Sequence, residues 1–218
     1  MTTARRCPVI GLVGGIGSGK SRVSAALARR GGRVVAGDPL GHEALRQPAV
    51  REKVIAGWEP GVLDAAGEID RRKLGAVVFA DECQRKALEA IVQPWIGERL
   101  REQIAAAQAD PAVPFVVLDA AVMLEAGWEG ACDVLVYVHA PRAVRLARVA
   151  AQRGWSPAEV AARERAQVSL TEKAARADVA VDNTGSLAEL EPQLNALLAS
   201  IGTLHPAVAG CGCGRVPV

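Results

Sequence analysis

The sequence predicts an α/β fold in which a five-stranded parallel sheet carries helices on both faces. Short apolar runs that read as strands alternate along the chain with segments rich in helix-forming residues. The strand runs are apolar at consecutive positions, as in parallel sheets that are covered on both faces. A glycine-rich turn after the first run opens a helix. Together these observations favour a three-layer arrangement of helix, sheet and helix.

The elements follow from local signals in chain order. Strands are expected at residues 8–13, 33–36, 115–118 and 134–138, and within 177–186. Helices are expected at 21–30, from 39, from 71 or 72, over 82–108, from 142, from 157 and over 187–201. Ser156 and Glu159 form a capping-box pattern around Pro157. Asp81 is expected to cap the long helix, and Pro94 predicts a break or kink in it.

The spacing of these elements predicts the domain organisation. No strand is expected between residues 47 and 110, so this block reads as an insertion between the second and third strands. We expect a single domain over residues 1–201, with the helical insertion at about 48–112 and an arginine-rich lid at about 142–175. Residues 202–218 are rich in Gly and Pro and are expected to form a flexible tail.

Residues Gly14–Ser21 match the phosphate-loop pattern G-x-x-x-x-G-K-[ST] at every fixed position. The glycines let successive backbone N–H groups converge on phosphate oxygens, and the helix that follows adds partial positive charge. Lys20 is expected to neutralise the outer phosphates, and the Ser21 hydroxyl can ligate Mg²⁺. The motif and its context favour the three-layer fold of P-loop NTPases. The expected nucleotide-binding residues are Gly14, Gly15, Ile16, Gly17, Ser18, Gly19, Lys20 and Ser21.

Two aspartates follow predicted strands, at the sheet edge where open α/β sheets bind ligands. Asp38 comes after the second strand, where it can face a ligand, cap the helix that starts at Pro39, or do both. Asp119 follows four apolar residues of the third strand, which fits the carboxylate that holds or orients the Mg²⁺ shell in phosphate-loop enzymes. The two acids are therefore candidates for substrate and metal contacts.

Six arginines occur within residues 142–165. Arg145 and Arg148 are three residues apart and share a helix face, and Arg163 lies on the next predicted helix. If they face the phosphate loop, these arginines can clamp a triphosphate. Otherwise they lie on exposed helix surfaces. Their partners would then be Glu159, Glu164 and Glu172.

Composition excludes several classes of function. A net charge of +2 is too small for a dedicated nucleic-acid surface, and no apolar run reaches the roughly 18 residues of a membrane span. Five widely spaced cysteines, and a first strand too near the N-terminus for a signal peptide, favour a reducing cytoplasm. Cys211 and Cys213 lack a second pair of metal ligands, so free thiols in a mobile tail are expected there.

Taken together, these motifs resemble those of the dephospho-CoA kinase family from residue 9 to about residue 197. IGLVGGIGSGKS (Ile10–Ser21) is similar to the family's G-L-T-G-G-I-G-S-G-K-S, and Ala36-Gly37-Asp38 stands in place of its D-A-D. DAAVMLE (119–125) corresponds to D-x-P-L-L-x-E. An Arg, a Gln four residues later, a Lys and then ADVAVDNTGS resemble the family's C-terminal pattern, which ends in A-D-x-V-I-D-N-x-G-S, within residues 163–186.

The resemblance implies a reaction: ATP, with Mg²⁺, phosphorylates the ribose 3′-hydroxyl of dephospho-CoA, the last step of coenzyme A synthesis. It implies Asp38 as the catalytic base and Asn183 as a neighbour of the ATP adenine. It implies Arg148 as the lid residue that closes over the phosphates, with Arg145 and Arg163 as alternatives. The acceptor pocket is expected in the helical insertion.

This chain departs from the family pattern at several positions. The replacements are Val13 for Thr, Ala36 for the first Asp of D-A-D, Gln93 for His, and Ala121 for Pro. The segment 141–148 is also one residue longer. Three other functions remain open: a small-molecule kinase with a nucleoside, nucleotide or shikimate-like acceptor, an ATP-binding relative without transferase activity, and a GTPase-like switch. The switch is disfavoured because no N-K-x-D motif follows a strand.

Overall fold

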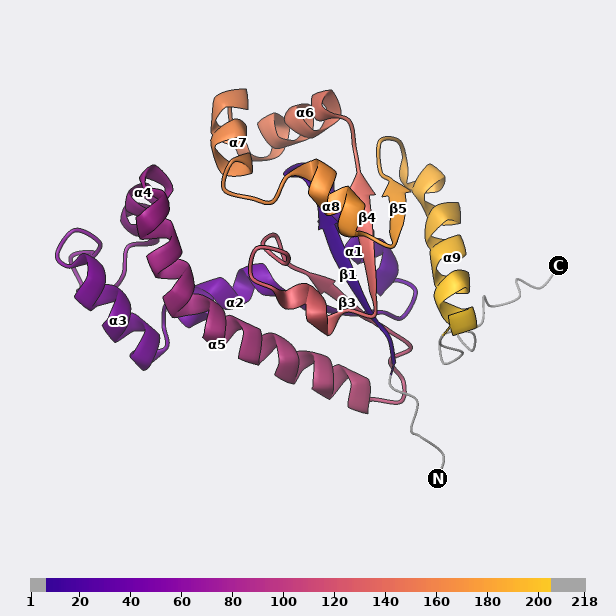
Figure 1. The fold of residues 1–218 in the computed structure, drawn as a ribbon, viewed down its shortest axis with the longest axis horizontal. Coiled ribbons are helices and arrows are strands. Elements are labelled where there is room, and N and C mark those ends of the chain that lie inside the picture. Colours follow the sequence, from indigo (N-terminus) through magenta and orange to yellow (C-terminus); the bar gives the residue numbers. More distant parts are fainter. Residues whose placement is uncertain (1–6, 205–218) are drawn as a thin grey trace. The chain divides into compact units, whose positions relative to one another are not determined.

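A five-stranded parallel sheet forms the centre of the fold, as predicted (Figure 1). The computed structural model describes residues 7–204, apart from the side chains of Phe79, Thr203 and Leu204. The strand order is β2-β3-β1-β4-β5. The strands are β1 (Val9–Gly14), β2 (Arg33–Ala36), β3 (Val116–Asp119), β4 (Val134–His139) and β5 (Val179–Asp182).

The strand register brings the carboxyl ends of four strands to one edge. Leu12 of β1 pairs with Asp119 of β3, and Gly14 pairs with Val138 of β4. His139 in turn pairs with Asp182 at the end of β5. Because parallel strands all end at the same edge, the glycine-rich turn, Asp119 and the turn after β5 gather there.

Helices surround the sheet. Their bounds are α1 (Lys20–Ala28), α6 (Arg142–Arg153), α7 (Pro157–Glu164), α8 (Leu170–Arg176) and α9 (Leu187–Leu204), with a 3₁₀ turn, η1, at Trp128–Ala131. The predicted capping box at the start of α7 is present: the Ser156 N–H donates to the Glu159 carboxylate, and the Glu159 N–H donates to the Ser156 hydroxyl. Helix α9 continues three residues beyond its predicted end. Residues 205–218 of the expected tail, with Cys211 and Cys213, lie outside the described residues.

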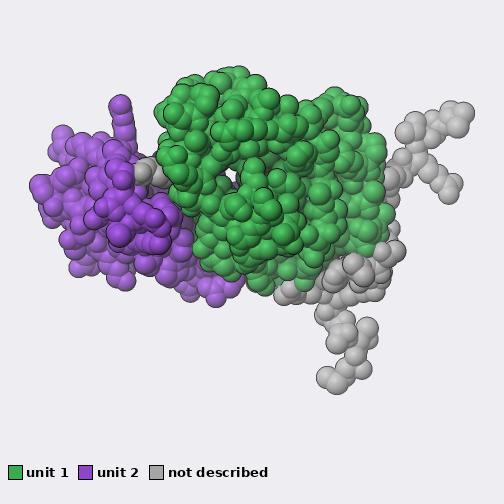
Figure 2. Space-filling model, turned by 45° about the horizontal axis from the view of Figure 1, so that its top comes forward, with its two compact units in different colours: residues 1–35, 103–218 green, residues 36–102 purple. Residues whose placement is uncertain are grey.

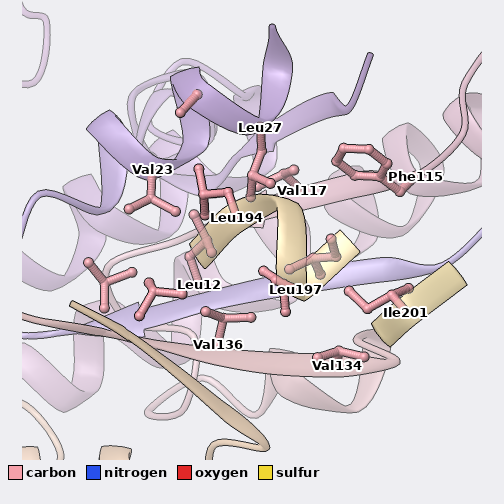
Figure 3. Packing of buried hydrophobic residues seen from close by; sticks show 14 of the residues in the cluster. Leu12, Val23, Leu27, Phe115, Val117, Val134, Val136, Leu194, Leu197 and Ile201 are labelled. Carbon is pink, nitrogen blue, oxygen red and sulfur yellow. The ribbon is translucent and has the colours of Figure 1, made fainter. Parts of the chain in front are cut away.

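The main hydrophobic core lies between the sheet and the helices α1 and α9 (Figure 3). Val23 and Leu27 of α1 and Leu194 of α9 are buried with Leu12 and Val136 of the central strands. Side chains alternate along a strand, so Gly11 points to the opposite face. There a Cβ would lie 2.5 Å from Cys132 Sγ and 3.0 Å from Met123 Sδ, so only glycine fits. Helix α8 contacts β1 and β4.

Residues 36–102 form a second compact unit (Figure 2, purple). It holds α2 (Gly37–Ala44), α3 (Pro48–Trp58), α4 (Arg71–Ala80) and most of α5 (Glu82–Ala109). Between residues 47 and 110, all of which are described, the sole β pairing is an isolated bridge from Leu63 to Ile69, which agrees with the expectation of no strand.

Three local expectations for this unit can be compared with the structure. Asp81 does cap α5, since its carboxylate accepts from the Cys83 N–H at 2.7 Å. Helix α5 is not broken at Pro94: this residue is exposed, and the buried Ile96 and Leu100 anchor the helix beyond it. Asp38 is not a helix cap, because α2 already begins at Gly37, so Asp38 lies in the first turn.

Candidate active site

The turn between β1 and α1 has the strand–loop–helix geometry that the phosphate-loop motif requires. Gly17 and Gly19 have φ values of +78° and +87°, in the left-handed region that side chains rarely adopt. Space is also lacking, because a Cβ at Gly17 would lie 2.5 Å from the Arg145 carbonyl oxygen. At Gly19 it would lie 2.2 Å from Asn183 Nδ2. Glycine is therefore required at both positions.

Two side chains of the motif lie where the loop becomes helix. Lys20 is the first residue of α1, and its Nζ lies 3.5 Å from the Gly14 carbonyl oxygen. Ser21 follows it in the first turn and is exposed. An ammonium group and a hydroxyl at a helix N-terminus make a favourable place for phosphate oxygens.

Arg145 joins helix α6 to the phosphate loop. Its side chain is only 4% exposed, and its Nη1 donates to the Ile16 carbonyl oxygen at 3.1 Å. The same nitrogen hydrogen-bonds Glu164 of α7, whose other carboxylate oxygen accepts from Arg142 at 3.0 Å. Burial opposes ionisation of Glu164, but the two arginines outweigh it and hold the pKa of Glu164 below its ordinary value. The carboxylate therefore stays charged and ties α6 and α7 together.

Arg148 and Asn183 join the phosphate loop to the turn after β5. Arg148 Nη2 donates to the Asn183 carbonyl oxygen at 2.7 Å, and Nη1 reaches the Ser18 carbonyl at 3.3 Å. Asn183 Nδ2 donates to the same Ser18 oxygen at 2.7 Å. Arg145 and Arg148 thus both contact the loop from one face of α6, as their spacing predicts.

Arg163 has a different surrounding from Arg145 and Arg148. Its guanidinium carbon lies 4.0 Å from the centre of the Trp155 ring, and that of Arg153 lies 4.8 Å from the same centre. Such stacking orients an arginine and leaves its N–H groups directed sideways. Trp155 lies in the turn between α6 and α7, so in this structure Arg163 packs against that turn.

The acidic candidates fall into different parts of the molecule. Asp119 ends β3 at the sheet edge that carries the phosphate loop, and it is half-buried. Asp38 is exposed in the first turn of α2 and belongs to the unit of residues 36–102. Within residues 7–204, no group of three or more His, Cys, Asp or Glu side chains is arranged to hold a metal ion.

Cys132 is not a candidate nucleophile. Burial raises the pKa of its thiol to about 12, so the thiol stays protonated.

Sequence reasoning gave no role to two residues that the structure places beside these elements. Arg22 Nη1 donates to the Gly185 carbonyl oxygen at 2.9 Å and to Asn183 Oδ1 at 3.3 Å. Lys173 is buried, and its Nζ donates to Gln167 Oε1 at 3.0 Å. The one available signal was the Lys between the Gln and the Ala-Asp pair in the C-terminal pattern.

Comparison with known proteins identifies the family. A family model described as dephospho-CoA kinase matches residues 8–189. The dephospho-CoA kinase of Geobacter sulfurreducens is 38% identical over 88% of this chain and 97% of its own. That of Thermus thermophilus is 40% identical over 88% and 91%.

Solved structures share the fold. A crystal structure from Thermus thermophilus has a TM-score of 0.77 at 39% identity and covers 90% of this chain and 99% of its own. The dephospho-CoA kinase from Campylobacter jejuni shares the fold, with a TM-score of 0.64 at 23% identity over 89% and 97%. No described helix is long and apolar enough to cross a membrane. The chain belongs to the dephospho-CoA kinase family.

Proposed function

We propose that this chain is a dephospho-CoA kinase, which transfers the γ-phosphoryl group of ATP to the ribose 3′-hydroxyl of dephospho-CoA. The observation that carries the proposal is the family match over residues 8–189, because that stretch includes every residue to which we give a role. We place the reaction in the cytoplasm.

The phosphate loop would bind the phosphates of ATP. Backbone N–H groups of residues 14–19 and the N-terminus of α1 favour anionic oxygens, and Lys20 adds a full positive charge beside them. In phosphoryl transfer the protein mainly positions the reactants and neutralises charge that spreads over the phosphoryl oxygens. Lys20 is therefore the residue of the loop on which turnover should depend most.

The donors present fit a magnesium ion. Ser21 supplies a hydroxyl and Asp119 a carboxylate, and both are the oxygen ligands that this hard cation prefers. When bound, Mg²⁺ supplies positive charge to the outer phosphates. We assign Ser21 to direct contact and Asp119 to orienting water in the metal shell.

Asp38 is our candidate for the base that accepts the proton of the attacking hydroxyl. Its position after β2 places it at the carboxyl end of that strand, where α/β sheets bind substrates. A loose transition state demands little nucleophile activation, so an ordinary carboxylate suffices. Residues 36–102, which include Asp38, would supply the acceptor pocket.

Arg148 is our candidate for the cation that closes over the phosphates. It is half-buried and its partners are neutral carbonyls of the loop and the turn after β5, whereas the buried Arg145 already pairs with the charged Glu164. Arg148 would exchange a carbonyl for a phosphate oxygen on closing. Closure would exclude water, which otherwise competes with the sugar hydroxyl as acceptor. The backbone of residues 183–186 would border the adenine.

Mass analysis of the product tests the function. The protein is incubated with Mg²⁺-ATP and dephospho-CoA, and we expect the acceptor to gain one phosphoryl group at the 3′ position while ADP is released. Lys20→Ala is the negative control and should give no detectable transfer. Phosphorylation of shikimate or a nucleoside in place of dephospho-CoA, or ATP binding without transfer to any acceptor, would contradict the proposal.

A further inference from the structure

Asn183 is one of the few polar residues that the described fold buries almost completely. It is 1% exposed and lies in the turn that follows β5. Its Nδ2 donates to the Ser18 carbonyl oxygen at 2.7 Å and lies 3.4 Å from the Gly19 carbonyl oxygen. These two acceptors belong to the phosphate loop, 165 and 164 residues away in the sequence.

The orientation of the Asn183 amide is fixed from its other side. Arg22 of α1 donates to Oδ1 at 3.3 Å, and an arginine has no acceptor, so this atom must be the oxygen. The backbone N–H of Asn183 donates to the His139 carbonyl oxygen at 2.9 Å, which anchors the residue to the end of β4. The amide is thus held between two strand ends and the first turn of α1.

These contacts determine where the backbone N–H groups of the phosphate loop point. A trans peptide unit is planar, so its C=O and N–H point in opposite directions. A hydrogen bond that holds the Ser18 carbonyl therefore also fixes the direction of the Gly19 N–H, which lies in the same plane and points the opposite way. Holding the Gly19 carbonyl does the same for the N–H of Lys20. These N–H groups are among those with which a phosphate loop binds oxygens.

The close approach of Asn183 also gives a reason for the glycine at position 19. A Cβ there would lie 2.2 Å from Asn183 Nδ2, and the φ of +87° adds backbone strain for any other residue. Arg148 of α6 supports the same contact, since it donates to the carbonyl oxygens of both Ser18 and Asn183.

We propose that Asn183 is a positioning residue of the phosphate loop: its side chain holds the Ser18 and Gly19 carbonyls so that the loop N–H groups face the nucleotide phosphates. It acts through the loop and does not read the adenine base. The inference rests on the proposed function only in taking ATP as the loop's ligand.

Binding measurements with two ligands can distinguish a role of Asn183 in positioning the loop from a role in recognising the base. Mg²⁺-ATP carries the base, and inorganic tripolyphosphate with Mg²⁺ carries only the phosphates. Affinities of wild type and Asn183→Ala for both are measured by calorimetry, or by displacement of a fluorescent ATP analogue where binding is weak. Without this donor the Ser18 carbonyl keeps only the longer hydrogen bond from Arg148, at 3.3 Å, and is free to turn, so we expect both affinities to fall together, by about tenfold or more.

Two further variants serve as checks. Asn195→Ala is the matched control: this asparagine is exposed on α9, and its Oδ1 accepts from Arg30 instead of contacting the phosphate loop, so both affinities should stay within about twofold. Asn183→Asp keeps the size of the side chain but replaces the donor with an acceptor, and should weaken both ligands at least as much as alanine does. Thermal unfolding of each variant identifies any that fails to fold, in which case the other carries the test.

The outcomes are distinct. Weakened ATP binding with unchanged tripolyphosphate binding would assign Asn183 to the base and overturn the inference, as would no effect on either ligand. If wild type bound neither ligand, the inference and the phosphate-loop assignment would both be wrong. If wild type bound ATP but left dephospho-CoA unphosphorylated, the proposed function would fail while the parallel loss in Asn183→Ala still supported the inference.

Discussion

Lys173 and Glu125 form a buried ion pair that joins α8 to the segment after β3. The Nζ of Lys173 lies 3.3 Å from Glu125 Oε1, and the two side chains are only 2% and 11% exposed. The same carboxylate oxygen accepts from the Val168 N–H at 2.7 Å, and Gln167 accepts a second hydrogen bond from the ammonium group. One pair therefore fixes the start of α8 and the residues that precede it.

We expect Lys173→Met to destabilise the protein strongly. Removing one partner of a buried pair leaves an uncompensated charge, and the cost is about 3–5 kcal/mol. The free energy of unfolding, measured with urea, tests this expectation. The double variant Lys173→Met, Glu125→Leu removes both charges and should recover much of the loss, because a well-packed apolar pair is often as stable. A Lys173→Met variant as stable as wild type would show that the pair contributes nothing.

Asp38→Asn should lower kcat by about a hundredfold or more, since general acid–base catalysis typically contributes about 10²–10⁴-fold, while ATP affinity stays unchanged. The amide keeps the size of the side chain but cannot accept the proton. Steady-state kinetics with dephospho-CoA, together with calorimetry for ATP, separates the two effects.

Glu43→Gln is the matched control, since Glu43 is an exposed acid of the same helix, α2. Its kcat should equal that of wild type. Unchanged turnover in Asp38→Asn would remove this residue from the mechanism, and a matching loss of ATP affinity would point to a role in binding.

The sequence allowed the sheet and several helix ends to be predicted because their signals are local. Apolar runs gave all five strands, and the capping pattern at Ser156 gave the start of α7. Helix α3 (Pro48–Trp58) escaped notice: its buried residues are only Val50 and Val54, which is too few for a clear helical period. The unbroken helix at Pro94 depends on packing beyond the proline, which local rules do not include.

The contacts of the candidate site were less predictable for a physical reason. The phosphate loop is recognisable because one short segment carries its whole geometry. Asn183 and Ser18 are 165 residues apart, and only the folded sheet brings the ends of β1 and β5 to the same edge. The burial of Arg145 against Ile16 and Glu164 was not predictable either, because a count of arginines gives no burial.

Glu164→Gln should make stability less dependent on pH. The pKa of Glu164 lies below its ordinary value of 4.5 in the folded chain, so its charged form stabilises the fold above that pH. At pH 7 the substitution should cost about 1–3 kcal/mol, as for a hydrogen bond to a charged group. As the pH falls below 4.5 and passes the lower folded pKa, wild type loses this contribution and the two curves should converge.

Urea unfolding between pH 3 and pH 7 measures this difference. Glu98→Gln, at an exposed position of α5, is the control and should change stability by less than about 1 kcal/mol at every pH. A constant gap between wild type and Glu164→Gln over the whole range would mean that the bonds from Arg142 and Arg145 do not depend on the carboxylate charge.

Gly17→Ala should damage both the fold and ATP binding, because the methyl group would meet backbone that cannot move aside. Its Cβ would lie 2.5 Å from the Arg145 carbonyl oxygen at a φ of +78°, and strain of this kind costs about 1–3 kcal/mol. Gly57→Ala is the matched control: Gly57 lies in α3 with no atom within 4 Å of the added carbon. A helix favours alanine over glycine, and Gly57 is the next-to-last residue of α3, so this control should gain at most about 0.5 kcal/mol and keep its ATP affinity. Thermal unfolding and ATP calorimetry on both variants would distinguish a constrained loop from a general intolerance of substitution. A constrained loop requires a loss of stability and ATP affinity for Gly17→Ala and no loss of either for Gly57→Ala.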